Sequence, residues 1–282
     1  MAESRVDPNI VIYSAPAVAQ YYAALSYLTP CERLLFATYL KPGMAILDLG
    51  VGGGRTTPHL SSIASRYVGV DYAEGMIAAC RRKFPQLAFE VADAADLSKF
   101  FPSSFDAVVI AFNGIDYVIP DEARFRALQE IRRVLKPDGI LIFSSHNPRS
   151  IWVRPSWNSQ RVRTVAESIM KSDSILFPAF LQLLTALRVV LAGAQAMLRS
   201  LQRGARRVPT LAFWRGQGYA RDSAHGGLTT HMAAPEQVES ELASFDLHPL
   251  RVLGDDYPRA SRRYVTDWFY YVFAKRCASG KK

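Results

Sequence analysis

Glycines follow a short apolar run in the stretch A-I-L-D-L-G-V-G-G-G-R, which spans residues 45–55. The apolar run predicts a strand covered on both faces of a parallel sheet, because such strands are apolar without alternation. Gly50, Gly52 and Gly54 permit a tight turn with positive φ, and their backbone can approach a ligand closely. A helix expected over 56–65 would begin at this turn, where its N-terminus attracts anionic groups. The stretch therefore predicts a nucleotide-like ligand, and the alternative is a tight strand–helix turn without one.

The glycine spacing separates two kinds of nucleotide site. A dinucleotide fingerprint G-x-G-x-x-G that begins at Gly50 requires a third glycine at position 55, where the chain has Arg55. The spacing found is D-x-G-x-G-x-G, beginning at Asp48. A nucleotide-cofactor oxidoreductase is therefore the runner-up interpretation.

Asp71 ends a second apolar strand, expected over 67–72, and lies 21 residues after Gly50. A carboxylate at that place can accept two hydrogen bonds from a ribose diol. The alternative is an N-cap for a helix that begins near Ala73. Both roles are compatible, and the spacing favours the ribose.

Strands and helices alternate along the rest of the core. Further strands are expected over 87–91, 104–112 and 140–144, and further helices over 73–84 and 121–135. Such alternation with short connections predicts a doubly wound parallel α/β sheet. Asn113 and His146 then stand at carboxyl ends of strands, where open α/β sheets keep their sites. A helix over 235–244 and strands over 247–253 and 268–274 follow, and leader helices are expected from Ser14 and over 30–40.

Residues 42–146 resemble the core of class I S-adenosylmethionine (SAM)-dependent methyltransferases. The resemblance lies in D-L-G-V-G-G-G, G-V-D, A-D-A, F-D-A-V-V and V-L-K-P-D-G, in that order. It implies a Rossmann-like sheet of seven strands in the order 3-2-1-4-5-7-6, with the last strand antiparallel beside the fifth. Val51 departs from the cysteine that many members carry, which should be harmless because the close approach depends on the glycines.

The resemblance also implies SAM as the cofactor. Asp48 and the glycines would hold its methionine end, Asp71 its ribose, and Asp93 with Ala94 its adenine. A turn-stabilising role is the alternative for Asp93. The expected cofactor-binding residues are Tyr13, Asp48, Gly50, Gly52, Gly54, Asp71, Tyr72, Met76, Asp93, Ala94, Phe112 and Asn113.

Methyl transfer is an in-line displacement in which the protein mainly binds and aligns the reactants. If the acceptor is a hydroxyl, a base near it helps, and His146 is the candidate catalytic residue. No metal site is expected, since no cluster of histidines and aspartates has ligand spacing. For the histidines the alternative is a structural role. The candidate substrate-side residues are Asn113, His146, Tyr219, His225 and His231.

The net charge of +9 is concentrated in one segment. Residues 149–225 contain twelve Lys/Arg and three Asp/Glu, which is +9, so the remainder is neutral. We expect a helical leader over 1–41, a SAM-binding core over 42–148, a basic and largely helical insertion over 149–225, and the closing part of the sheet over 226–276.

The insertion contains an amphipathic helix candidate over 178–203. It could be a lid over the active site, an element on an anionic membrane surface through 178–207, or a homo-oligomer contact. A membrane span by the insertion is disfavoured, because its longest uncharged run, 174–187, has 14 residues. Nucleic acid is not expected as a partner, since the arginines do not cluster with stacking aromatic residues.

Composition indicates a globular protein in a reducing compartment. Charged residues are 21% of the chain, and the three cysteines are widely spaced. No apolar signal core is present in M-A-E-S-R-V-D-P, so a cytoplasmic location is expected, with possible peripheral membrane contact. The sequence predicts methyl transfer from SAM to a small-molecule or lipid-linked acceptor. A non-catalytic SAM-binding, membrane-associated module is an alternative from another class.

Overall fold

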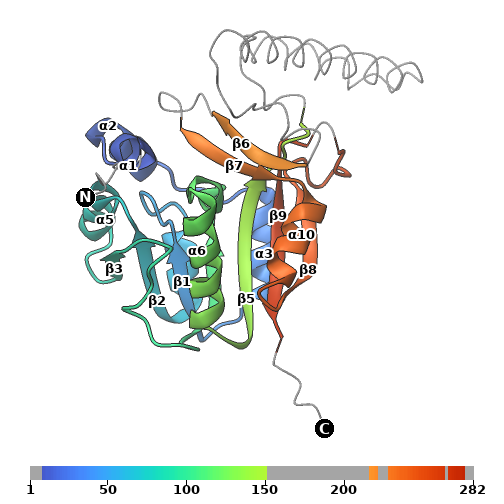
Figure 1. Ribbon diagram of the computed structural model, residues 1–282. Helices are drawn as coiled ribbons and strands as arrows, with labels where there is room; N and C mark the ends of the chain where they lie inside the picture. Colours follow the sequence, from blue (N-terminus) through green and yellow to red (C-terminus); the bar gives the residue numbers. More distant parts are fainter. Residues whose placement is uncertain (1–7, 151–215, 222–227, 264–265, 277–282) are drawn as a thin grey trace, which may run out of the picture.

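The computed structural model describes residues 8–150, 216–221, 228–263 and 266–276. Its main feature is a seven-stranded sheet in the order β3-β2-β1-β4-β5-β9-β8 (Figure 1). The first five strands are parallel, and β9 is inserted antiparallel between β5 and β8. The predicted order 3-2-1-4-5-7-6 is therefore confirmed, with β8 and β9 as the sixth and seventh strands. The strands are β1 (Met44–Leu49), β2 (Ala64–Asp71), β3 (Ala88–Val91), β4 (Phe105–Ile110), β5 (Leu135–His146), β8 (Leu247–Gly254) and β9 (Trp268–Lys275).

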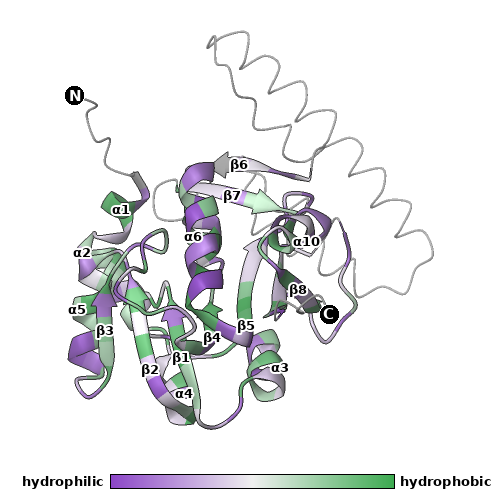
Figure 2. Ribbon diagram, turned by 60° about the horizontal axis from the view of Figure 1, so that its bottom comes forward, coloured by the Kyte–Doolittle hydropathy of each residue, from purple (hydrophilic) through white to green (hydrophobic). Residues whose placement is uncertain are grey.

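Helices cover both faces of this sheet, as a doubly wound fold requires. Successive side chains of a strand point to opposite faces, and Ile46 and Leu47 accordingly belong to two separate buried clusters. The cluster around Leu47 includes side chains of α6 and α10, and the cluster around Ile46 includes side chains of α3, α4 and α5. In Figure 2, α6 is mostly hydrophilic while β4 is hydrophobic. These helices are α3 (Pro30–Tyr39), α4 (Thr57–Ile63), α5 (Glu74–Lys83), α6 (Asp121–Val134) and α10 (Pro235–Ala243).

The leader contains one helix more than the sequence predicts. Helix α1 (Pro8–Tyr13) precedes α2 (Pro16–Ala23), whereas the first helix expected from the sequence begins at Ser14. Proline suits the first turn of each of these helices. The side chain of Asn9 donates to the Thr229 carbonyl at 2.8 Å and accepts from the Thr229 N–H at 3.0 Å. A partner 220 positions away thus holds this short helix.

A two-stranded hairpin lies above the carboxyl edge of the sheet (Figure 1). It pairs β6 (Gln217–Arg221) with β7 (Thr229–Ala233), where no strands are expected from the sequence. The expected domain boundary at 225 falls between the two strands, and the domain division stays a prediction. The helix candidate over 178–203 and most of the basic insertion lie outside the described residues. Within the described residues, no helix has the length and apolar character to cross a membrane.

Candidate active site

A cleft opens at the carboxyl ends of β1, β2 and β4, and the leader borders it. It encloses about 1170 Å³, the open space at its mouth included, compared with the roughly 300–1,000 Å³ of typical ligand sites. In open α/β sheets, ligands bind beyond the strand ends where the strand order reverses, here between β1 and β4. Its lining comes from the glycine loop, the ends of β2 and β4, residues 92–94, the leader and the short 3-10 helix η1 (Gly114–Tyr117).

The glycines serve three different purposes. Gly50 and Gly52 have φ of 73° and 54°, and an added Cβ would meet no atom within 4 Å. Both line the cleft, so their backbone is open to a ligand. Gly54 has φ of 81° but lies outside the cleft lining, because its missing side chain faces Phe84 and Cys80. The expected cofactor contact of Gly54 is therefore not seen, and this glycine packs the loop against α5.

Gly53 supports the leader. Its φ is not in the positive range, yet an added Cβ would lie 2.2 Å from the Ala23 nitrogen and 2.3 Å from the Tyr22 carbonyl carbon. Both are main-chain atoms, so no side-chain rotation can relieve the clash. The C-terminal end of α2 therefore rests directly on the glycine loop.

Replacing Gly53 with alanine is expected to lift α2 off the loop. Overpacking of this kind costs about 1–3 kcal/mol, and chymotrypsin should cleave the leader at Tyr21 and Tyr22 faster. The matched control is Gly75→Ala in α5, where the Cβ would lie an ordinary 3.6 Å from the Ser14 carbonyl. Mass spectrometry of timed digests measures both. Equal cleavage rates in the two variants would contradict the placement of α2.

Asp71 combines the two roles that the sequence left open. Its Oδ2 accepts from the Gly52 N–H at 2.9 Å, and its Oδ1 accepts from the Ala73 N–H at 2.9 Å. The residue is 7% exposed and lines the cleft. Burial raises the pKa of the Asp71 carboxyl to about 6. The carboxylate thus ties the glycine loop to the start of α5 while facing the ligand space.

Asp48 lies one layer beneath the cleft. Its Oδ2 accepts from the Thr56 hydroxyl and from the Tyr67 hydroxyl, both at 2.8 Å. The side chain is 1% exposed, is absent from the cleft lining, and has its pKa raised to about 6 by burial. Where the resemblance implies a contact with the methionine end, the structure places a support under the loop, since the hydroxyls of Thr56, just before α4, and of Tyr67 in β2 both donate to Oδ2, while the buried Oδ1 has no hydrogen-bond partner among the described residues.

The expected adenine side is more open. Asp93 is exposed and lines the cleft, and its Oδ1 accepts from the Ala95 N–H at 2.8 Å. Ala94, Tyr72 and Met76 line the same cleft, with Met76 buried. Asp93 therefore stabilises a turn and also borders the ligand space.

Four tyrosine rings line the cleft. Tyr13 lies with its ring centroid 6.0 Å from that of Tyr22, 6.2 Å from that of Tyr72 and 5.7 Å from that of Tyr117. Burial raises the pKa of the Tyr13 phenol well above its ordinary value, so the hydroxyl stays neutral. The leader thus contributes an aromatic, uncharged wall, as the expected contact of Tyr13 requires.

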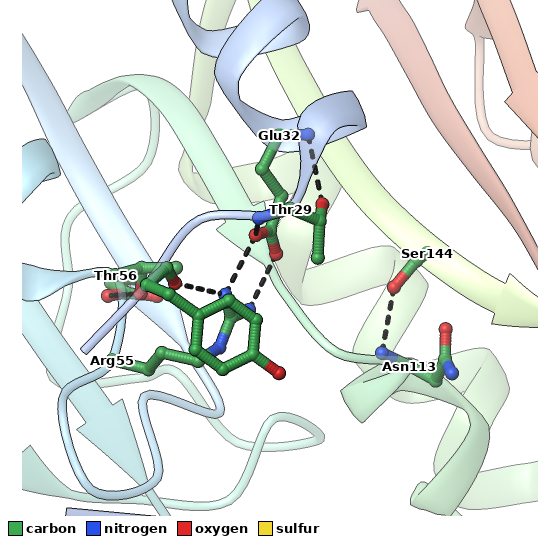
Figure 3. Close-up of polar contacts among 8 residues, drawn as sticks. Thr29, Glu32, Arg55, Thr56, Asn113 and Ser144 are labelled. Carbon is green, nitrogen blue, oxygen red and sulfur yellow. Dashed lines mark hydrogen bonds and ion pairs between the residues drawn. The ribbon is translucent and has the colours of Figure 1, made fainter. Parts of the chain in front are cut away.

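Arg55 has a role that sequence reasoning missed. Its guanidinium donates to both carboxylate oxygens of Glu32 at 2.7 and 2.6 Å, and to the Tyr27 carbonyl at 2.7 Å (Figure 3). Its Cζ lies 4.8 Å from the centroid of the Phe112 ring. Glu32 also caps α3 through the Thr29 N–H at 2.8 Å. The pair therefore joins the leader to the glycine loop, and only the absence of a third glycine marked the position in the sequence.

Phe112 and Asn113 turn the chain sharply after β4. Their φ values are 57° and 61°, in the left-handed region that non-glycine residues seldom adopt. The Asn113 N–H donates to the Ser144 hydroxyl at 2.8 Å, which fixes the turn against β5 (Figure 3). Phe112 lines the cleft, and the side chain of Asn113 lies behind it, 3.2 Å from Nε2 of His146.

His146 stands at the end of β5, as predicted. It is absent from the cleft lining, and Tyr117, which does line the cleft, packs edge-on against its ring at 6.3 Å between centroids. Its Nδ1 lies 2.8 Å from Oδ2 of Asp116, a residue that the sequence did not single out. The structure thus brings Asn113 and His146 together and adds a buried carboxylate.

The remaining substrate-side candidates belong to the hairpin. Tyr219 and His231 are cross-strand partners with ring centroids 5.4 Å apart, and the Tyr219 hydroxyl donates to Asp121. Burial, with the nearby Arg124 charge, lowers the pKa of His231 to about 4, so its ring is neutral at pH 7. Neither residue lines the cleft, which agrees with the structural alternative. His225 lies outside the described residues.

No group of three or more histidine, cysteine or acidic side chains that could hold a metal ion occurs in the described part of the chain.

Comparison with known proteins identifies the core. Residues 46–139 match the family model described as "Methyltransferase domain". A demethylmenaquinone methyltransferase of Beutenbergia cavernae is 39% identical over 102 residues, which are 36% of this chain and 40% of that protein. A trans-aconitate 2-methyltransferase of Variovorax paradoxus is 26% identical over 166 residues, which are 53% of this chain and 62% of that protein. The chain thus spans about half the length of the curated relatives it matches.

Solved structures share the fold. The 1,6-didemethyltoxoflavin-N1-methyltransferase of Burkholderia thailandensis, with 1,6-didemethyltoxoflavin and S-adenosylhomocysteine (SAH) bound, superposes with a TM-score of 0.56 at 14% identity. The alignment covers 98% of this chain and 94% of that one. Fold, cleft and matched residues agree: residues 46–139 are a methyltransferase domain, and the sheet around them has the fold of the SAM-dependent methyltransferases.

Proposed function

We propose that this protein transfers a methyl group from SAM to a small-molecule acceptor. The observation that carries the proposal is the cradle formed by Gly50, Gly52 and Asp71. The two glycines expose main chain to the cleft where a Cβ would stand in the ligand space, and the carboxylate borders the same space. A ligand with a ribose diol and a flexible tail fits this donor and acceptor set. The matched methyltransferase domain favours this reading over the oxidoreductase alternative.

The residues of the cleft would have the following roles in binding SAM. When bound, SAM supplies a methyl group activated on a sulfonium sulfur. The sulfur is the leaving group and keeps the electron pair of the S–CH₃ bond. Asp71 would accept from the ribose hydroxyls, and Asp93 would accept from the adenine amino group. Tyr72 and Met76 would pack against the nucleoside. Tyr13 and Tyr22 would cover the ligand and exclude water.

The acceptor is an aromatic ring with a hydroxyl group. Towards η1 and α6 the cleft is lined by Ile115, Tyr117, Val118 and Ile119, facing Tyr13 from the leader. Among the described lining residues, charged side chains are Arg55, Asp71 and Asp93, and Arg55 is paired with Glu32. A tricarboxylate such as trans-aconitate would lack counter-charges here, whereas a quinol ring would pack against tyrosines. The relative that acts on demethylmenaquinone supports this choice.

Incubation with methyl-labelled SAM tests the acceptor class. We expect label in 1,4-dihydroxynaphthalene and at least about tenfold less in trans-aconitate, because an unpaired charge is costly in an apolar wall. Asp71→Ala is the control: labelling that takes place in the cleft should fall in this variant, and labelling that does not depend on the cleft should remain. Preferential labelling of trans-aconitate would contradict the aromatic acceptor, while leaving methyl transfer itself supported.

Two predictions are supported by the sequence alone. One is the contact of 178–207 with an anionic membrane surface, and the other is the homo-oligomer contact. Co-sedimentation with anionic liposomes that fades with salt is the expected result for the former.

A further inference from the structure

The carboxylate of Asp116 is surrounded by donors from the end of β5. Its Oδ1 accepts from the Ser145 hydroxyl at 2.7 Å, and its Oδ2 accepts from the His146 N–H at 2.7 Å. Nδ1 of the His146 ring is 2.8 Å from the same Oδ2. Asp116 is fully buried, while the His146 side chain is 15% exposed. The carboxylate is therefore fixed in place and held against one edge of the ring.

This arrangement decides which ring nitrogen carries the proton. An ionised carboxylate can only accept hydrogen bonds, so Nδ1 of His146 must donate to Asp116. The lone pair of the neutral ring is then on Nε2. Nδ2 of Asn113 lies 3.2 Å from Nε2 and donates to that lone pair. With the opposite tautomer, two donors would meet at Nε2, and a lone pair would face a carboxylate at Nδ1.

Asn113 links the ring to the cleft. Phe112 and Gly114, on either side of it, line the cleft. Strained backbone of the kind seen at Phe112 and Asn113 clusters at functional sites. Asn113 is 7% exposed, and among the described residues its Oδ1 has no hydrogen-bond partner. A buried acceptor without a donor suits a ligand hydroxyl that enters between Asn113 and the ring.

We propose that Asp116 is a positioning residue that holds His146 as the Nδ1–H tautomer, so that Nε2 can take the proton of an acceptor hydroxyl. The inference rests on the proposed methyl transfer to such an acceptor. In this step the O–H bond breaks, its electron pair stays on the acceptor, and the proton bonds to Nε2 in place of the Asn113 amide. The imidazolium that forms is balanced by the Asp116 carboxylate and later returns the proton to water.

Nitrogen-15 NMR of histidine-labelled full-length protein tests the tautomer without any acceptor. His146→Gln assigns the resonances. At alkaline pH, where imidazoles are neutral, we expect the Nδ1–H pattern for His146, whereas histidine in water favours Nε2–H. An Nε2–H pattern in the wild-type protein overturns the proposal.

The variant Asp116→Ala removes the acceptor that faces Nδ1, and it should shift His146 towards Nε2–H and leave His59 and His248 unchanged. Ser145→Ala removes a donor to Asp116 without altering the ring contact, and should keep Nδ1–H. A folded Asp116→Ala protein with an unchanged Nδ1–H pattern overturns the proposal. If this variant does not fold, the wild-type tautomer decides.

Kinetics separate positioning from support of the fold. With an acceptor that is methylated through its hydroxyl, Asp116→Asn should lower kcat about 100-fold. The Kd of SAH should stay within about twofold, because the Asp116 carboxylate faces the end of β5 and does not line the cleft. Equal losses in kcat and SAH affinity would indicate a structural role and overturn the proposal. Absence of SAH binding by the wild-type protein would instead refute the proposed function, with the tautomer still read by NMR.

Discussion

Replacing Asp71 with alanine is expected to weaken SAH binding at least about 100-fold. Each hydrogen bond to a charged group contributes about 1.5–3 kcal/mol, and a diol supplies two donors. The change also leaves the Gly52 and Ala73 N–H groups without their carboxylate. Isothermal titration with SAH measures the effect. Asp71→Asn keeps an acceptor oxygen for one of these donors and should fall between alanine and wild type.

Asp93→Ala is the matched control, since Asp93 borders the same cleft but is exposed. We expect a loss of about tenfold or less, because solvent competes for that hydrogen bond. The pH dependence provides a second check. The pKa of Asp71 is raised to about 6, so its carboxylate is ionised above that pH and protonated below it. SAH affinity should therefore fall as pH drops through about 6, and Asp71→Ala should lack this step. Equal affinities of Asp71→Ala and Asp93→Ala would exclude Asp71 as the ribose ligand.

Replacing Arg55 with methionine is expected to cost about 3–5 kcal/mol of folding free energy. The change leaves Glu32, which is 2% exposed, as a buried charge without its partner. At about 2–4 °C per kcal/mol, the Tm should fall by about 10 °C. Calorimetry or thermal circular dichroism measures it.

The double variant Arg55→Met/Glu32→Gln should regain most of this loss, because the uncompensated charge is gone and the glutamine can still cap α3 through its oxygen. The matched control is Arg132→Met, which breaks the exposed pair with Asp246 and should cost about 1 kcal/mol or less. If the double variant is no more stable than Arg55→Met, the buried pair is not the source of the effect.

The sheet and the cleft follow from the sequence because their signals are local. Apolar runs and the glycine turn specify parallel strands and a ligand loop within a few residues. Asp71 could be assigned by its distance from Gly50, since a βαβ unit has a nearly fixed length. His146 could be placed at the end of a strand for the same reason.

What the sequence did not indicate depends on partners far along the chain. In the sequence, Arg55 marks only the absence of a third glycine. Its ion pair with Glu32, 23 positions earlier, is seen only in the folded protein. Asp116 has no distinguishing feature in the sequence. Its contact with His146, 30 positions away, forms only because β5 places the two residues side by side. The hairpin is anchored by Asn9, 220 positions from Thr229. Asp48 and Gly54 carry the family pattern but support the loop from beneath, because strand alternation and packing turn them away from the ligand space.

A crystal structure of the protein with SAH would show whether this cleft binds the cofactor through Asp71 and the glycine loop. We expect the ribose hydroxyls within hydrogen-bond distance of Asp71, the main chain of Gly50 and Gly52 against the ligand, and the sulfur directed towards Phe112 and η1. SAH bound elsewhere, or in this cleft with its ribose away from Asp71, would contradict this expectation.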